Sequence, residues 1–354
     1  MKISNSQFCV LLILVRIFTL IAYFPQSGGI SQGSHMLGIL LSSVAQCVMI
    51  LPILALNKTF SGKNLAEIAK IENLVFGKTI ALIYVVFFVF SAAKTVADFQ
   101  KFSAETFPSN GNWLSGAVIL VGVAVYAAFL GIEGIARSGW IELALFATMT
   151  VFIGIFLIVG GKADMLNFQP SYRISDGKIF TAAVEDFAKS SELVLVCVLA
   201  PFLKNSVRKG FFGYLASKII ILEVISMLII TVLGDFSQIS RYPFFSLGGK
   251  LGTVGRTDAI FIVVWSIAAI IRLALFVFSS GIFLEAVFPK MKYKNIISGG
   301  LILVATAFVA LTEVGKTAVS TLTSAVPLLL LFFVIPLILL IVNSLLCSPR
   351  KVRS

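Results

Sequence analysis

The sequence is poor in the residues that enzymes most often use for chemistry. Its single histidine, His35, excludes most histidine-based catalysis and histidine-based metal clusters. The four cysteines stand apart in apolar runs, without the spacing of a zinc site or of a disulfide framework. The sequence also contains no nucleophile–base pair and no phosphate-binding loop. We therefore expect a protein that is not an enzyme and that holds neither a metal nor another cofactor.

Charged residues are also scarce, at 12%, whereas 58% of the residues are hydrophobic and the mean hydropathy is +1.03. A soluble domain does not need that much apolar surface, so the composition predicts a polytopic membrane protein with one transmembrane domain over residues 1–354. The net charge of +12 indicates basic cytoplasmic loops and not nucleic-acid binding. Residues 1–7 carry one lysine, and no small-residue cleavage site follows them, which favours a retained first helix over a signal peptide.

A helix that crosses a bilayer needs about 20 mostly apolar residues. Ten segments meet this rule, roughly 8–30, 36–56, 77–102, 113–130, 139–160, 180–203, 210–234, 257–288, 296–312 and 321–347. The even number places both termini on one side of the membrane. If that side is the inside, the inner connections hold fifteen lysines and arginines and the outer ones eight. The positive-inside rule then predicts cytoplasmic termini.

The sixth segment is interrupted by three acids, a lysine and two serines between Glu185 and Glu192. Ionisable groups inside a membrane indicate a functional site. We expect a broken helix here, with Ser190 and Ser191 capping a half-helix from Glu192 to Phe202. The alternative is an ordinary helix whose polar face packs on its neighbours.

The first segment carries its own interruption, because Pro25 and a glycine-rich turn follow Phe18–Phe24. Interrupted segments one and six occupy equivalent places in two halves, about 8–160 and 180–347. This pairing predicts an all-α, ten-helix inverted-repeat fold (5+5) with broken helices 1 and 6 and a site at the bilayer midplane.

Further charges lie inside the predicted spans. Lys94 and Asp98 share a helix face at i,i+4, and they either neutralise each other or line a cavity. Arg16 either snorkels to the inner surface or needs a buried partner. The candidate structural or coupling charges are Arg16, Asp98, Glu223 and Arg272. Arg16 and Arg272 are possible counter-ions of Glu192, Glu223 or Asp98, and the residues alone do not assign the pairs.

Several short motifs, in order across the spans, point to one family. They are Ile3–Phe8, Asp98–Phe102, Ser191–Val194, Arg241–Pro243, Gly255–Phe261, Trp265 and Arg272–Phe276. In these motifs the chain resembles the permease-like B subunits of spore germinant receptors, which are relatives of the amino acid–polyamine–organocation transporters. The resemblance runs nearly end to end.

This resemblance implies unwound first and sixth helices around a small-molecule site, with a nutrient, usually an amino acid, as ligand. It also implies a complex with an A subunit and a lipoprotein C subunit in the spore inner membrane. The chain departs from the family at two positions, where Phe18 and Ser191 replace a common glycine and add bulk near the expected site.

The resulting hypothesis is a ligand-sensing membrane subunit that binds a free amino acid and signals to partner subunits. The ligand carboxylate would meet backbone N–H groups near Thr19, Leu20, Ile21 and Ala22. The ligand ammonium would meet carbonyls near Ser190, Ser191 and Glu192, and Lys94 and Trp265 would form the walls. The alternatives are a secondary amino acid transporter and an architectural subunit with a non-binding pocket.

Overall fold

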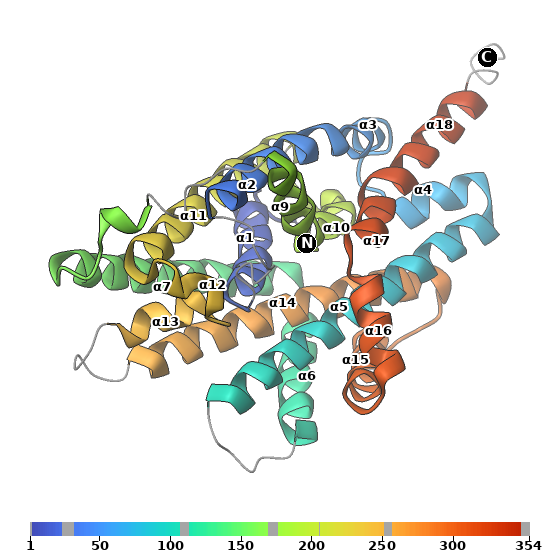
Figure 1. The fold of residues 1–354 in the computed structure, drawn as a ribbon. Coiled ribbons are helices and arrows are strands. Elements are labelled where there is room, and N and C mark those ends of the chain that lie inside the picture. The colour runs from blue at the N-terminus through green and yellow to red at the C-terminus, as the bar shows by residue number, and fades with distance from the viewer. Residues whose placement is uncertain are drawn as a thin grey trace.

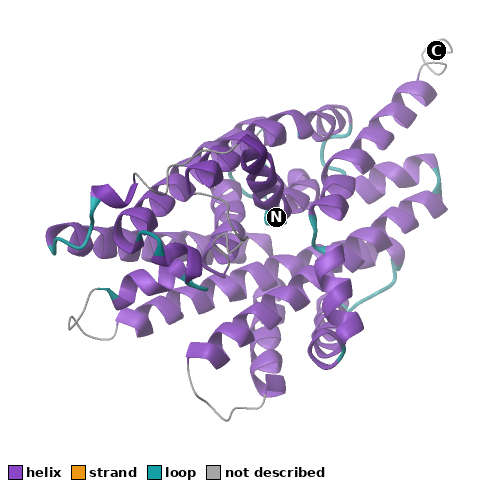
Figure 2. Cartoon of the chain, viewed as in Figure 1, coloured by secondary structure: helices purple, strands orange, loops and turns teal. Residues whose placement is uncertain are grey.

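The computed structural model describes residues 2–22, 32–106, 113–168, 176–204, 206–250 and 257–347. Every named element in these ranges is a helix (Figure 2). The elements of the first half are α1 (Asn5–Ala22), α2 (Gln32–Met49), α3 (Leu51–Thr59), α4 (Leu65–Glu72), α5 (Leu74–Thr106), α6 (Trp113–Phe129), α7 (Gly131–Val159) and η1 (Met165–Asn167). Those of the second half are α9 (Asp176–Ala188), α10 (Glu192–Leu199), η2 (Ala200–Phe202), α11 (Val207–Leu233), α12 (Phe236–Ile239), α13 (Pro243–Gly249), α14 (Thr257–Val287), α15 (Lys294–Leu311), α16 (Glu313–Leu322), α17 (Ala325–Leu329), η3 (Leu330–Val334) and α18 (Ile335–Cys347).

Seven helical stretches among the described residues are long and apolar enough to cross a membrane. They are Gly33–Thr59, Leu74–Glu105, Gly131–Val159, Val207–Leu233, Ile260–Val287, Lys294–Leu311 and Glu313–Leu345. Three shorter apolar helices, Asn5–Leu20, Trp113–Phe129 and Glu192–Phe202, fall in the remaining predicted segments. The membrane-protein class and the order of the segments follow the sequence-based expectation. The predicted break near Pro25 lies outside the described residues.

The helices form one bundle with α1 near its middle (Figure 1). The two long helices α5 and α14 pack along each other, and α1 contacts α7, α10, α11 and α14. Helix α2 lies against α9. Large apolar side chains remain exposed on the outer helices, for example Ile119 on α6 and Val159 on α7. In a bilayer these side chains face lipid, so their exposure costs nothing there.

The last span is irregular and contains two prolines, Pro327 in α17 and Pro336 in α18. A break at residues 323–324 separates α16 from α17, and the π-helical turn η3 follows α17 before α18 begins. Proline removes a backbone donor and frees carbonyls of the preceding turn. The Tyr84 hydroxyl donates a hydrogen bond of 2.5 Å to the Leu331 carbonyl, which satisfies one such buried group from the side of α5.

The N-terminal residues pair with the segment that follows α10. The Ile3 amide donates to the Phe202 carbonyl at 2.8 Å, and the Lys204 amide donates to the Ile3 carbonyl at 3.0 Å. These two bonds form an isolated parallel bridge between Ile3 and Leu203. The start of α1 and the end of the α10 segment therefore meet at one end of the bundle.

Candidate ligand site at the break between α9 and α10

The polar stretch of the sixth segment does interrupt the helix. Helix α9 ends at Ala188 and α10 begins at Glu192. The predicted hydroxyl caps are wrong, because Ser191 makes no side-chain cap bond and the Ser190 hydroxyl donates to the Asp186 carbonyl at 2.9 Å. Instead, the Leu193 amide donates to the Ser190 carbonyl at 3.0 Å, so the backbone itself turns the chain. Both serine side chains are thus available for other contacts.

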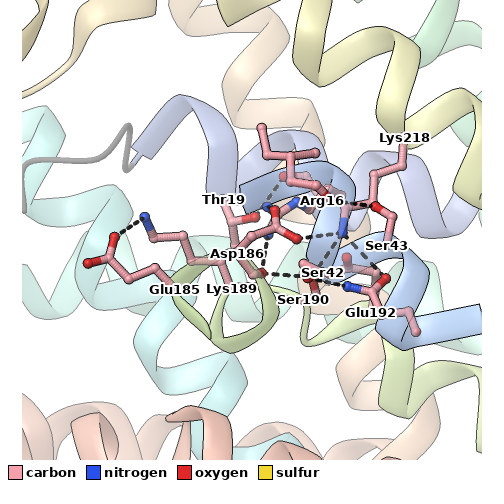
Figure 3. A network of polar contacts seen from close by, with 12 residues as sticks. Arg16, Thr19, Ser42, Ser43, Glu185, Asp186, Lys189, Ser190, Glu192 and Lys218 are labelled. Atoms are coloured by element: carbon pink, nitrogen blue, oxygen red, sulfur yellow. Dashed lines mark hydrogen bonds and ion pairs between the residues drawn. The ribbon is translucent and has the colours of Figure 1, made fainter. Parts of the chain in front are cut away.

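A buried ionic network lies next to this break (Figure 3). One oxygen of the Asp186 carboxylate forms an ion pair with Arg16 on α1. The other oxygen accepts from Lys218 Nζ on α11 at 2.9 Å. Lys218 Nζ also lies 3.4 Å from the Ser190 hydroxyl and 3.4 Å from the amide oxygen of Gln46. At most 5% of each of the three charged residues is exposed, so one carboxylate compensates two desolvated cations.

This network corrects the expected pairing of Arg16. Its partner is Asp186, and not Glu192, Glu223 or Asp98 as considered from the sequence. Asp186 lies in the last turn of α9, and its carboxylate reaches Arg16 on α1 and Lys218 on α11. Two signals in the sequence point to it: it is four residues from Ser190 on one helix face, and Lys218 is an intramembrane lysine that requires an acid.

Glu192 opens α10 as a fully buried carboxyl group. One of its oxygens accepts a hydrogen bond of 2.6 Å from the Tyr214 hydroxyl on α11. The other oxygen has no hydrogen-bond partner within the described part of the chain. Glu223 lies further along α11, half-buried, also with one such unpartnered oxygen.

Arg272 on α14 joins the break to α1 and α5. Its Nη2 donates to the Ser191 hydroxyl at 3.1 Å, its Nη1 to the Val15 carbonyl at 2.7 Å and its Nε to the Thr95 hydroxyl at 2.9 Å. The guanidinium also lies 5.1 Å from the ring centres of Phe18 and Phe276. All three of these oxygens are neutral, so this buried cation is held by dipoles and aromatic faces.

A small cavity of about 30 Å³ connects these elements. It is lined by Thr19, Ser91, Lys94, Asp98, Ala188, Lys189, Ser191, Arg272 and Thr323. Lys94 Nζ donates to the Thr323 hydroxyl at 3.4 Å, and Lys189 pairs with Glu185 at 3.9 Å. A volume of this size holds about one water molecule. The lining combines three cationic side chains, one carboxylate and four hydroxyls.

The structure brings some of the predicted residues together and separates others. The cavity lining includes Thr19, Lys94 and Ser191 from the predicted binding set, and Asp98 and Arg272 from the predicted charges. Four other members of the binding set, Leu20, Ser190, Glu192 and Trp265, lie outside the lining. Ile21 and Ala22 end α1, and their side chains are outside the described part.

Trp265 is buried in an aromatic cluster and not at the cavity wall. Its ring stacks on Phe18 at 5.3 Å and on Phe99 at 5.1 Å, and Phe102 approaches edge-on at 4.3 Å. Phe18 thus lies between Trp265 and the Arg272 guanidinium. The bulk expected from Phe18 fills space beside the cavity, which is one reason why the cavity is small.

The described residues contain no group of three or more histidine, cysteine, aspartate or glutamate side chains that could hold a metal ion. The cavity is lined by charged side chains and hydroxyls, and the aromatic rings of Phe18 and Trp265 lie beside it.

Comparisons with known proteins agree with this picture. A family model described as "Spore germination protein" matches residues 2–318. No curated protein sequence matches the chain. Among solved structures, the fold is similar to a Na+-coupled sialic acid symporter in a substrate-bound outward-open state, with a TM-score of 0.62 and 14% sequence identity. The match covers 93% of this chain and 77% of the symporter chain. That likeness establishes a transporter-like fold.

Proposed function

Because the chain belongs to the spore germination protein family of permeases, we propose that it is the ligand-binding membrane subunit of a nutrient germinant receptor. In this proposal it lies in the spore inner membrane with both termini on the cytoplasmic side. It assembles with a receptor A subunit and a lipoprotein C subunit. Ligand binding triggers germination through these partners.

The ligand is a free amino acid in the cavity between α1, α5, α14 and the break. The observation that carries this choice is the composition of the lining, which holds three cationic side chains, Lys94, Lys189 and Arg272, and one carboxylate, Asp98. An excess of cationic groups favours a ligand that carries a carboxylate. The hydroxyls of Thr19 and Ser191 supply neutral hydrogen bonds.

The small volume of the cavity indicates how ligand binding would change the conformation of the chain. An amino acid needs several times the space of one water molecule, so in this proposal the cavity must widen before it admits the ligand. A ligand that fits only a more open state shifts the population toward that state. The broken segment and α1 border the cavity on one side and the ionic network on the other. An opening of the cavity therefore changes the packing of both, and the partner subunits respond to that change.

The experiment is thermal unfolding of the purified chain in detergent micelles against a panel of free amino acids. A ligand at one hundred times its Kd stabilises a protein by about 2.7 kcal/mol. At roughly 2 °C per kcal/mol for a chain of this size, the expected shift is about 5 °C. Thr19→Trp fills the cavity and should abolish the shift. The matched control is Val118→Trp on α6, where the side chain is exposed to lipid and the shift should persist.

If no amino acid shifts the thermal unfolding of the chain alone or of the assembled receptor, the assignment of an amino acid as ligand is contradicted. Suppose that the receptor complex fails to assemble without this chain, but that spores carrying any cavity variant germinate normally. The chain is then an architectural subunit.

The second candidate function is secondary transport of an amino acid. The transporter-like fold and the buried Glu192, which has one unpartnered oxygen among the described residues, favour it. The carboxyl of Glu192 would then carry the coupling charge. Uptake into vesicles that contain only this chain, driven by a proton or Na+ gradient and lost in Glu192→Gln, would establish transport. If neither gradient drives uptake, ligand sensing remains the proposed function.

A further inference from the structure

A second, larger hollow lies on the outside of the bundle, away from the ligand cavity. It is a groove of about 580 Å³ between α3 and the first turns of α11, which lie side by side in Figure 1. Its apolar part consists of Leu51 and Leu54 on α3 and Phe212 on α11. Its charged lining residues, Lys58 and Arg208, are both basic and both exposed.

Each wall of the groove carries a basic side chain and an apolar side chain, and the order from basic to apolar runs in the same spatial direction on both walls. On α3, Lys58 follows Leu54 by four residues, and on α11, Phe212 follows Arg208 by four residues. Four residues correspond to about 6 Å along the helix axis. Because α3 ends and α11 begins at the groove, both walls place a basic group at the rim and an apolar side chain one turn deeper. This gradient matches the boundary between lipid head groups and acyl chains.

The groove lies on the N-terminal side of the molecule. The side-chain amide of Asn5 donates a hydrogen bond of 3.3 Å to the carbonyl of Ser206, which lines the groove. The Ile3–Leu203 bridge holds the chain just before α11 at the same end. Lys204 and Lys209, both exposed, lie within two residues of the groove residues Ser206 and Arg208 in the sequence, so they add basic charge to this end of the molecule. The charge distribution of the sequence predicts that this side is cytoplasmic, where anionic lipids attract such clusters.

The start of α11 adds a second feature that favours an anion. Its N-cap residue, Ser206, makes no side-chain cap bond, so the backbone donors of the first turn receive no such partner. The positive end of the helix dipole points to the same place as Arg208. A phosphate at the rim would meet the side-chain charges of both walls together with this turn.

We propose that the groove binds one anionic diacyl glycerophospholipid. The phosphate lies between Lys58 and Arg208 at the rim, and an acyl chain runs over Leu51, Leu54 and Phe212. This site is separate from the ligand cavity, and its occupancy does not depend on the proposed germinant function.

Binding is measured by native mass spectrometry of the full chain released from detergent micelles. The probes are phosphatidylglycerol and phosphatidylcholine with identical acyl chains. Wild type should retain phosphatidylglycerol more tightly. Each basic residue near an anionic lipid surface contributes about a fivefold gain in affinity, so Lys58→Gln/Arg208→Gln should weaken phosphatidylglycerol binding on the order of twentyfold. Binding of phosphatidylcholine should change little.

The matched control is Lys290→Gln/Lys292→Gln, which removes two exposed charges from the predicted cytoplasmic side outside the groove. It should bind phosphatidylglycerol as wild type does. Phe212→Ser should weaken both lipids alike, because it removes acyl-chain contact.

Three outcomes would overturn the proposal. Equal affinity of wild type for the two lipids would remove the anionic selectivity. An equal loss in the control variant would show a general surface effect. Full competition by glycerophosphoglycerol, which lacks acyl chains, would show a site for the anion alone. Size-exclusion profiles establish that the compared variants are folded.

Discussion

Asp186→Asn is the substitution that most directly tests the ionic network. Asn keeps the size of the side chain but removes the charge that Arg16 and Lys218 share. Breaking a buried ion pair by removing one partner costs about 3–5 kcal/mol, because the other charge stays desolvated. Here two cations lose their carboxylate, so we expect the upper part of that range.

The assay is thermal unfolding in detergent micelles, followed by loss of the monodisperse chromatographic peak. At roughly 2 °C per kcal/mol, the upper part of that range means that Asp186→Asn should lower the Tm by about 8–10 °C. The adjacent Glu185→Gln is the control, because its pair with Lys189 spans 3.9 Å and each partner is 26% exposed. Such a pair contributes at most about 1 kcal/mol. A Tm for Asp186→Asn within about 2 °C of wild type would refute the reasoning.

A double-mutant cycle identifies the cause of the loss. Lys218→Met removes one cation and leaves the Arg16–Asp186 pair intact. The combination Asp186→Asn/Lys218→Met should therefore be less destabilised than the sum of the two single variants. Residues in one network show coupling energies of about 0.5–3 kcal/mol. Additive effects would mean that Lys218 draws no stabilisation from the carboxylate.

Three further predictions concern single contacts, each checked by thermal unfolding. Tyr214→Phe should cost about 1–3 kcal/mol because it removes the one hydrogen bond that the described residues give to the buried Glu192 carboxylate, and a neutral result would contradict that hydrogen bond. Gly38→Ala should cost about 1–3 kcal/mol, since its Cβ would lie 2.5 Å from an alanine Cβ of α9. Gly213→Ala, with no atom within 4 Å, should instead gain up to about 1 kcal/mol; equal effects at the two glycines would argue against close α2–α9 packing. Arg241→Ala should cost no more than about 1 kcal/mol, because its carboxylate partner on α5 is exposed. A larger loss would show that this pair anchors α13.

The positions of the apolar helices along the chain could be predicted from the sequence because hydrophobic length is a local property, whereas the 5+5 repeat stays a prediction. The interruption between Ala188 and Glu192 was also readable, since several polar residues cluster in an apolar segment. The partner of Arg16 was not, because Asp186 lies 170 residues away and its direction depends on how α9 packs. Trp265 shows the same limit: an aromatic side chain in an apolar span suits a cavity wall and a packed cluster equally well. The volume of the cavity depends on side-chain packing around Phe18, which the sequence does not specify.

The bridge between Ile3 and Leu203 has a mechanical consequence. It fastens the start of α1 to the end of the α10 segment by backbone bonds, while Thr19 and Ser191 border the cavity at the other ends of these two helices. Near the cavity the described residues of the two helices are joined by hydrogen bonds only through a side chain, because Arg272 donates to the Val15 carbonyl and to the Ser191 hydroxyl. Under the proposed function, a movement that breaks these side-chain bonds while the backbone bridge holds would widen the cavity toward the side opposite the N-terminus, and the ligand would enter from that side.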